Sequence, residues 1–304
     1  MNVPIVVLNF ALAILVAPLL DGVRRKITAR LQNRVGPPIP QSWKDVIKLF
    51  GKETILPEGS GTLIRVIPTL MLILSISMFA TISTVTSQSP IEDGGILFIE
   101  LAVLSAFVFA IAGSMSRNPY GVVGGSREVI LATLVEPSII VSLTSLILFK
   151  GSTTLDDSSR GVTLGVFLVM AAPAYLLSLL AESGRVPFDV AEAESELSGG
   201  ALMEFSGAPL ATLKLGQYMR SLALFSALKF YLTPLIPLSV TGMGFSVTVA
   251  VLYVISLLVC TLLVSLAESL NARYRLLEAS RFYAFVLIFA SLVLVLSFLF
   301  PGLR

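Results

Sequence analysis

The sequence predicts an all-α integral membrane protein with about eight transmembrane helices and a short amphipathic helix on the cytoplasmic side. Three observations predict this class. The 304 residues are 55% hydrophobic, with a mean hydropathy of +0.91, which is more apolar surface than one aqueous globule buries. Eight apolar stretches have about the 20 residues that cross hydrocarbon as a helix. None shows the alternating pattern of a barrel strand, so helices are the structure that satisfies the backbone in lipid. The bilayer is therefore the first expected partner, and no nucleic acid is expected.

The stretches follow one another in a single transmembrane domain that covers residues 1–304. The first has a basic cluster after it and none before it, which predicts a retained helix rather than a signal peptide. Four polar residues between positions 214 and 229 interrupt the sixth. The predicted spans are residues 3–20, 62–86, 95–114, 127–149, 161–181, 209–235, 242–267 and 282–300.

Lysine and arginine are distributed unevenly among the connections. Residues 21–61 carry eight of them and residues 268–281 carry three, whereas the opposite side holds only Lys150, Arg160 and the terminal Arg304. By the positive-inside rule, we expect a multi-pass protein of the cytoplasmic membrane with both termini outside. Two cytoplasmic segments follow from this topology: a basic loop, residues 21–61, and an acidic loop, residues 182–208.

The basic loop combines a rigid turn with an amphipathic helix. Gln32 and Arg34 precede a proline-rich turn that begins at Gly36 and Pro37, and "SWKDVIKLFGKE" then predicts a short helix. Such a helix either lies on anionic lipid or, beside a rigid turn, forms a platform for a soluble partner. The turn favours the platform. The apolar side of the helix consists of Trp43, Val46, Ile47 and Phe50.

The acidic loop gathers carboxylates between two apolar spans. If "FDVAEAESEL" is helical, Asp189, Glu192 and Glu196 share one face. Like-charge repulsion and desolvation raise carboxylate pKa values, which predicts proton exchange near neutral pH. Arg185 is placed to pair with one of these acids. The alternative is a solvated loop without function. The acids of the loop are Glu182, Asp189, Glu192, Glu194, Glu196 and Glu204.

Further acids lie within the predicted spans. Glu100 is in the third, and Glu128 and Glu136 are in the fourth, about 12 Å apart along one face. A carboxylate inside a membrane helix is costly and marks an ion pathway by default. For Glu128 a second interpretation is an interfacial carboxylate paired with Arg127.

Lys229 is a cation deep in the sixth span. It must snorkel, lose its proton or pair with a membrane carboxylate, and the last arrangement would make a movable ion pair. The chain has no histidine and one cysteine, Cys260, so we expect no cofactor, metal or redox centre on it.

Three segments carry a resemblance to a known family: "RLQNRVGPP" with "DVIKLFGKE", "AESGRVPFDVAEAESELSGGALMEFSG", and "NARYRLLEASRFY". From about residue 18 to residue 283 the chain resembles the membrane subunit that anchors the peripheral arm in respiratory complex I. The same subunit occurs in energy-converting nickel-iron hydrogenases, formate hydrogenlyases and membrane-bound sulfur reductases. The resemblance implies eight transmembrane helices, no redox centre, and the start of a carboxylate-rich proton path beneath the last iron-sulfur cluster.

The family pattern transfers to particular positions. The acids of the acidic loop, with Arg185, Pro187 and Phe188, match the family's acidic cytoplasmic loop, and Glu136 matches the acid of its fourth span. The loop after the first helix, which shapes the quinone entrance in complex I, corresponds to Gln32, Arg34, Gly36 and Pro37.

Two departures favour the hydrogenase branch. Complex I members have Gly-Pro-Asn where this chain has Gly-Pro-Pro at positions 36–38. They also place an acid in the sixth span near the position where this chain has Leu228 and Lys229. The resemblance then implies a ferredoxin-linked complex that couples electron transfer to proton or sodium translocation. Alternatives are the same role in a sulfur reductase, a quinone-binding subunit of complex I, and a stand-alone secondary transporter, for which the halves show no repeat.

The implied partners fall into two groups. The peripheral arm would supply nickel-iron-hydrogenase-like large and small subunits and a ferredoxin-like subunit, which hold iron-sulfur clusters and a NiFe centre. The membrane would supply small subunits and antiporter-like subunits.

Overall fold

The computed structural model describes residues 3–55, 62–82, 93–115, 118–150, 153, 155, 166–235 and 242–299. Within these ranges the chain is helical and has no β-strand, which confirms the predicted all-α class. The long helices are α1 (Val3–Leu31), α3 (Thr62–Ala80), α4 (Gly94–Ser114), α5 (Pro119–Lys150), α6 (Val166–Glu182), α8 (Gly207–Ala227), α10 (Gly242–Leu270) and α11 (Leu276–Leu299). The short elements are α2 (Gln41–Phe50), α7 (Glu194–Leu197), α9 (Lys229–Leu232) and the 3₁₀ turns η1 (Gly200–Leu202) and η2 (Thr233–Leu235).

Each predicted apolar stretch coincides with a helix, and the sixth is divided between α8 and α9. Residues 83–86, 161–165 and 300 of these stretches lie outside the described residues. By length and composition, four helices of the described chain can cross a membrane: Gly94–Ser114, Pro119–Phe149, Val247–Leu270 and Leu276–Leu296. α1 continues past the predicted end at residue 20 because its polar extension packs against other elements through buried Arg24 and Thr28.

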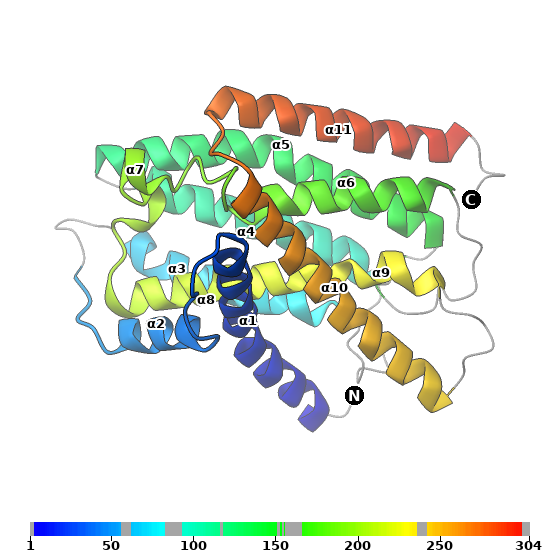
Figure 1. The fold of residues 1–304 in the computed structure, drawn as a ribbon, viewed down its shortest axis with the longest axis horizontal. Helices are drawn as coiled ribbons and strands as arrows, with labels where there is room; N and C mark the ends of the chain where they lie inside the picture. The colour runs from blue at the N-terminus through cyan, green and yellow to red at the C-terminus, as the bar shows by residue number, and fades with distance from the viewer. Residues whose placement is uncertain are drawn as a thin grey trace.

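The helices form one bundle (Figure 1). α3 packs along α8, and α5 packs against α4, α6 and α11. α1 packs against α10 and α8, and both α1 and α10 run obliquely across the other helices (Figure 1). α2 and α7 lie toward the left in Figure 1, whereas α11 ends at the right. The two loops of interest are thus at the same end of the bundle.

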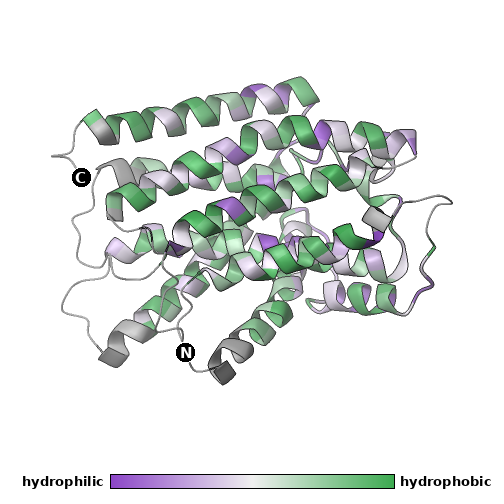
Figure 2. Cartoon of the chain, turned by 180° about the vertical axis from the view of Figure 1, so that it is seen from behind, coloured by the Kyte–Doolittle hydropathy of each residue, from purple (hydrophilic) through white to green (hydrophobic). Residues whose placement is uncertain are grey.

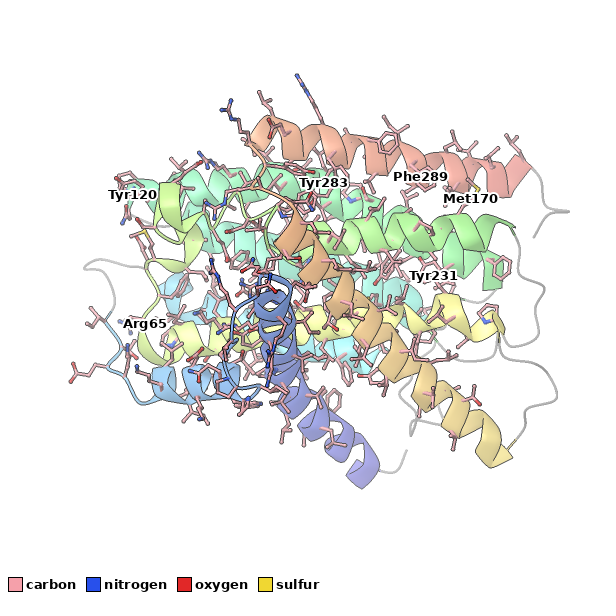
Figure 3. All side chains as sticks on the ribbon, viewed as in Figure 1. Arg65, Tyr120, Met170, Tyr231, Tyr283 and Phe289 are labelled. Atoms are coloured by element: carbon pink, nitrogen blue, oxygen red, sulfur yellow. The ribbon has the colours of Figure 1, made fainter. Side chains whose placement is uncertain are left out.

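Two buried tyrosines connect the central helices. The rings of Tyr175 in α6 and Tyr231 in α9 stack with 5.3 Å between centroids. Tyr175 donates to the carbonyl of Leu224, and Tyr231 donates to the carbonyl of Ser142, both at 2.8 Å. Both hydroxyls are therefore satisfied inside an apolar core. Figure 3 shows Tyr231 toward the end of the bundle opposite to Tyr120.

Glycine permits two close backbone approaches. A Cβ on Gly125 of α5 would lie 2.4 Å from the backbone nitrogen of Ser114, where α4 ends. A Cβ on Gly22 of α1 would lie 1.9 Å from the carbonyl oxygen of Ile39. The second contact means that the proline-rich turn rests directly on α1, without an intervening side chain.

The outer surface of the helices is largely apolar. Figure 2 shows apolar residues along most of the helices, with polar residues gathered near the loop end and at a few points inside the bundle. Large apolar side chains such as Val251 and Leu258 of α10 and Phe285 and Ile288 of α11 are exposed. An exposed apolar surface this extensive requires lipid or a partner to cover it.

Candidate functional site

A cavity of about 130 Å³ lies between the acidic loop and helices α1, α4, α5, α6, α8 and α10. Six carboxylates and three guanidiniums line this cavity, which we call the acidic cavity. With all nine groups ionised, its lining has an excess of three negative charges. The acids are Asp21, Glu128, Glu136, Glu182, Asp189 and Glu192, and the bases are Arg24, Arg185 and Arg220.

Arg220 of α8 is the buried centre of the acidic cavity. Its guanidinium pairs with Glu182 at the end of α6 and donates to Oε1 of Glu136 in α5 at 2.7 Å. On α4 it donates to Oγ of Ser105 at 2.7 Å and to the carbonyl of Ala102 at 3.1 Å. The planar fork of arginine suits such multiple contacts. One side chain therefore joins four helices, and its single positive charge is shared by two acids.

One carboxylate oxygen of Glu136 is buried without a hydrogen-bond donor from the described residues. Oε1 accepts from Arg220, whereas Oε2 is buried and has no hydrogen-bond partner within the described part of the chain. A buried acceptor without a donor costs free energy, and polar cavities hold water that satisfies such atoms. Oε2 is therefore suited to receive a proton or a water hydrogen bond.

The acidic loop does not form the predicted helix. Residues 183–193 run through turns and bends, and α7 covers only Glu194–Leu197. The expectation that Asp189, Glu192 and Glu196 share one helical face is therefore wrong. The physical reason is that contacts with residues far away in sequence, rather than local helical hydrogen bonds, fix this part of the chain.

Those contacts come from the connection between α10 and α11 and from α11 itself. The ring of Phe188 lies 5.5 Å from that of Tyr274 and 4.8 Å from that of Tyr283. Asp189 accepts from Arg273 at 2.8 Å, and the Tyr274 amide donates to the carbonyl of Pro187 at 2.9 Å. Figure 3 shows Tyr283 below α11, on its bundle side. The loop is thus anchored at Pro187–Asp189.

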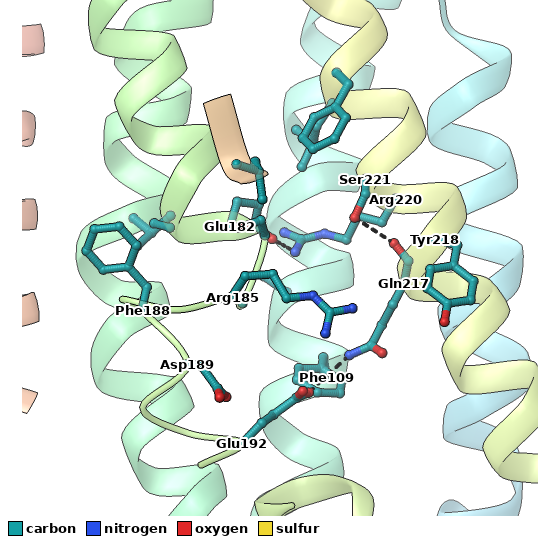
Figure 4. A pocket seen from close by; sticks show the side chains of 18 of the residues that line it. Phe109, Glu182, Arg185, Phe188, Asp189, Glu192, Gln217, Tyr218, Arg220 and Ser221 are labelled. Atoms are coloured by element: carbon teal, nitrogen blue, oxygen red, sulfur yellow. Dashed lines mark hydrogen bonds and ion pairs between the residues drawn. The ribbon is translucent and has the colours of Figure 1, made fainter. Parts of the chain in front are cut away.

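Glu192 lies on the loop side of the acidic cavity. Its Oε1 accepts from the side-chain amide of Gln217 at 3.3 Å. Burial raises the pKa of Glu192, and the positive charge of Arg185 offsets part of that rise. Figure 4 shows Arg185 pointing into the cavity between Glu182 and Glu192. One loop acid therefore keeps its proton to a higher pH than a solvated glutamate does.

A second ion cluster lies where α1, α2 and α10 meet the acidic loop. Asp21 accepts from Arg24 and from Oγ of Ser42, each at 2.8 Å. Arg24 also pairs with Glu268 of α10. Arg185 approaches Asp21 at 3.4 Å, so its ionic partner is on α1 and not, as predicted, in its own loop. This contact links the acidic loop to the base of the basic loop.

Glu128 lines the acidic cavity. Arg127 pairs with Glu196 at 2.8 Å and so does not act as the partner that the interfacial alternative assigned to Glu128. The hydrogen bond from Arg127 lowers the pKa of the exposed Glu196. Glu204 accepts from the backbone amide of Asn118 at 2.8 Å. Glu196 and Glu204 therefore lie outside the cavity, and the Glu194 side chain is outside the described residues.

Two predicted relay residues lie apart from the acidic cavity. Glu100 is on the exposed side of α4, and Lys229 begins α9, fully buried, with Nζ 4.8 Å from the centroid of Phe230. Neither lines the cavity. Glu136 takes Arg220 as its partner.

The basic loop presents an exposed surface on a fixed base. α2 confirms the predicted amphipathic helix, although only Val46 of its predicted apolar side is fully buried. Trp43 donates from its indole nitrogen to the carbonyl of Leu15 at 2.8 Å, which ties α2 to α1. Of the predicted docking residues in the turn, Gln32 and Arg34 are exposed, and Gly36 and Pro37 are half-buried.

Sequence reasoning missed the roles of Arg220 and Asp21. A usable signal existed for Arg220, because an arginine inside a membrane helix is expected to pair with an acid. That argument was applied to Lys229 and not to Arg220. Asp21 had no comparable signal, since it stands at the edge of the first apolar stretch. Across the described residues, no group of three or more cysteine or acidic side chains is arranged to hold a metal ion.

Comparisons with known proteins agree with this fold. Residues 3–299 match the family described as NADH dehydrogenase. Hydrogenase-4 component C of Escherichia coli (strain K12) is 34% identical over 279 residues, which cover 88% of this chain and 89% of that protein. Formate hydrogenlyase subunit 4 of the same organism is 33% identical over 268 residues, 86% of this chain and 87% of that protein.

Two further matches extend the comparison. A subunit of the NADH-quinone oxidoreductase of Rhodospirillum centenum is 32% identical over 243 residues, 71% of this chain and 70% of that protein. A chain in the solved structure of a membrane-bound sulfane sulfur reductase, described as an archaeal respiratory membrane complex, has a TM-score of 0.80 at 22% identity. It covers 96% of this chain and 98% of that chain, and this likeness shows a shared fold.

Proposed function

Because the chain belongs to the NADH dehydrogenase family, we propose that it is the membrane subunit of a complex-I-like, ion-translocating oxidoreductase. In this role it docks the peripheral redox arm and couples electron transfer there to proton or sodium movement. The observation that carries the proposal is the acidic cavity, in which buried Arg220 bridges Glu136 and Glu182 directly beneath the acidic loop. The chain itself contributes no redox centre.

The proposed topology has eight spans in the cytoplasmic membrane and both termini outside. Support comes from the eight apolar stretches, each of which coincides with helix, and from the basic residues at the end of the bundle that holds α2 and α7. In this orientation the exposed Gln32 and Arg34 face the cytoplasm, where a soluble arm can dock on them.

The hydrogenase branch is the preferred assignment within the family. The two hydrogen-metabolism relatives align with 86% to 88% of this chain, and the quinone oxidoreductase relative aligns with 71%. The arm would then hold iron-sulfur clusters and a NiFe centre in hydrogenase-like large and small subunits and a ferredoxin-like subunit. Antiporter-like and small membrane subunits would complete the complex. A sulfur or quinone acceptor is the alternative.

Coupling is assigned to charge changes at the acidic loop. A change of charge in the docked arm acts on the loop through Arg185, whose 3.4 Å contact with Asp21 is the longest ionic contact described for the two clusters. A shift of Arg185 changes the field at Glu192, because the positive charge of Arg185 is the main one that stabilises the ionised form of Glu192. Glu182 and Glu136 share Arg220, so a proton gained at one of them frees the guanidinium for the other. Glu136 Oε2 is the position from which a proton continues into the membrane.

The test is to purify the intact complex through a tag on this subunit, identify its companions by mass spectrometry and assay its metals. Nickel together with a hydrogenase-like large subunit is the expected result. A nickel-free complex with the same architecture would move the assignment to the sulfur or quinone alternative. Purification of this chain without any redox subunit would overturn the proposal.

A further inference from the structure

α4 carries a carboxylate on its outward face. Five of its exposed residues recur at intervals of three and four, which places them in one stripe along the helix. Four of these five are large and apolar, and the fifth is Glu100. We call these residues the α4 stripe: Leu97, Glu100, Leu104, Phe107 and Ile111.

The outward faces of α10 and α11 differ from the α4 stripe. In α10 the single charged residue is Glu268, within the last turn. In α11 no charged residue follows Arg281, so its exposed side, which includes Phe285 and Ile288, is apolar from there onward. Such faces are suited to lipid. The α4 stripe alone among these three combines apolar side chains with a charge inside the span.

Glu100 is too deep in α4 for an interfacial residue. It is the seventh residue of a 21-residue helix, about 6 Å along the axis from the midpoint at Leu104. Its side chain is short, and an ionisable group at such depth that faces hydrocarbon is rare because it is costly to insert. Among the described residues, no ion pair joins Glu100 to another side chain of this chain. The required partner must therefore come from outside that part of the chain.

We propose that the α4 stripe is the seat of a transmembrane helix from a partner membrane subunit, which presents a hydrogen-bond donor to Glu100. The donor belongs to a lysine, arginine, amide or hydroxyl side chain, because these groups satisfy a carboxylate within a membrane. Leu104, Phe107 and Ile111 supply the apolar contact area of the seam. The inference depends on the membrane location of α4 and not on ion coupling at the acidic cavity.

This seat would place the partner one helix away from Arg220. Ser105 and Ala102, on the inner side of α4, are the groups that Arg220 contacts. Glu100 and Leu104 are on the opposite side of the same two turns. A partner helix on the stripe would thus be separated from the acidic cavity only by α4, whose diameter with side chains is about 10 Å.

The direct test is site-specific photo-crosslinking in native membranes that contain the intact complex. The photoreactive residue p-benzoylphenylalanine replaces Leu104 in one variant and Leu258 of α10 in the control, since the two leucines are 50% and 45% exposed. We expect a protein adduct at position 104 that contains another membrane subunit, and lipid adducts at position 258. Lipid adducts alone at position 104, or an adduct with a second copy of this chain, would overturn the proposal.

A substitution series tests the donor. If the stripe faces lipid, Glu100→Leu removes a costly carboxylate and leaves the complex intact. If a partner helix binds there, Glu100→Leu should reduce co-purification of the cross-linked subunit about fivefold, whereas Glu100→Gln, which retains an acceptor oxygen, should keep most of it. Equal retention of that subunit in the leucine variant and the unmodified protein would contradict the assigned contact. Neither readout measures ion pumping, so failure here is distinct from failure of the coupling role.

Discussion

Replacing Arg220 by methionine removes the cation that two buried carboxylates share. Methionine is unbranched and fills much of the same space, so the main change is electrostatic rather than a cavity. Glu136 and Glu182 then lose their partner, and the hydroxyl of Ser105 and the carbonyl of Ala102 lose a donor. The polar contacts that join α8 to α4, α5 and α6 at this point are then lost.

The expected magnitude follows from the burial of the ion pairs. The side chain of Arg220 is 10% exposed, and that of Glu136 is 3% exposed. Removing one partner of a buried pair costs about 3–5 kcal/mol, whereas an exposed pair contributes about 1 kcal/mol or less. We expect Arg220→Met to lie in the higher range. Arg220→Lys keeps the positive charge but not the planar guanidinium, so the stability of this variant should lie between that of Arg220→Met and that of the native protein.

Thermal and denaturant unfolding of the purified complex measure this effect, with Arg65→Met, at an exposed position of α3, as the control. The double variant Arg220→Met/Glu136→Gln should be more stable than Arg220→Met alone, because one uncompensated charge has been removed. Arg220 does not hold the acidic cavity together if Arg220→Met unfolds like the Arg65→Met control. The same conclusion follows if the effects of Arg220→Met and Glu136→Gln on stability are simply additive.

Three further outcomes are expected. Burial raises the pKa of Glu192 in the folded protein above that in the unfolded chain. The stability of the folded protein should therefore fall as the pH rises from about 4 through that raised value. Glu192→Gln should flatten this part of the pH profile of thermal unfolding. Gly22→Ala places a Cβ 1.9 Å from the carbonyl oxygen of Ile39, so it should cost about 1–3 kcal/mol and speed tryptic cleavage of the basic loop, whereas Gly51→Ala, with no neighbour closer than 3.7 Å, should do neither. Phe188→Ala should cost about 3–5 kcal/mol and increase hydrogen exchange across the acidic loop; unchanged exchange would show that the aromatic contacts do not anchor it.

The helices were predictable because hydropathy and backbone hydrogen bonding leave few alternatives in lipid. α10 and α11 follow directly from their long apolar runs. The polar extension of α1 beyond residue 20 was not predicted, because its charged side chains resemble those of a loop. Only the tertiary structure shows that Asp21 and Arg24 of this extension are buried in ion pairs.

The acidic cavity was predictable in composition but not in pairing. Glu136, Glu182, Asp189 and Glu192 were identified from residue type and position, and all four line it. Their partners come from distant parts of the chain, and no local pattern encodes such pairing. Arg220, for example, is 84 residues from Glu136.

The loop shows the same limit. The spacing of its acids suggested one helical face, yet Phe188 and Asp189 are held by the segment that contains Arg273 and Tyr274. Helical periodicity cannot anticipate contacts across more than 80 residues of sequence. The acids that were expected on one helical face therefore lie on an irregular loop, which the segment around Arg273 and Tyr274 holds against the acidic cavity.

The central claim, that the acidic cavity couples electron transfer to ion movement, is tested most directly by Glu136→Gln in inverted membrane vesicles. The variant keeps an acceptor for Arg220 but cannot take up a proton, and ion uptake is measured together with the electron-transfer rate. The account predicts an assembled complex in which electron transfer proceeds and coupled ion uptake is lost. Normal ion uptake per electron in that variant would contradict it.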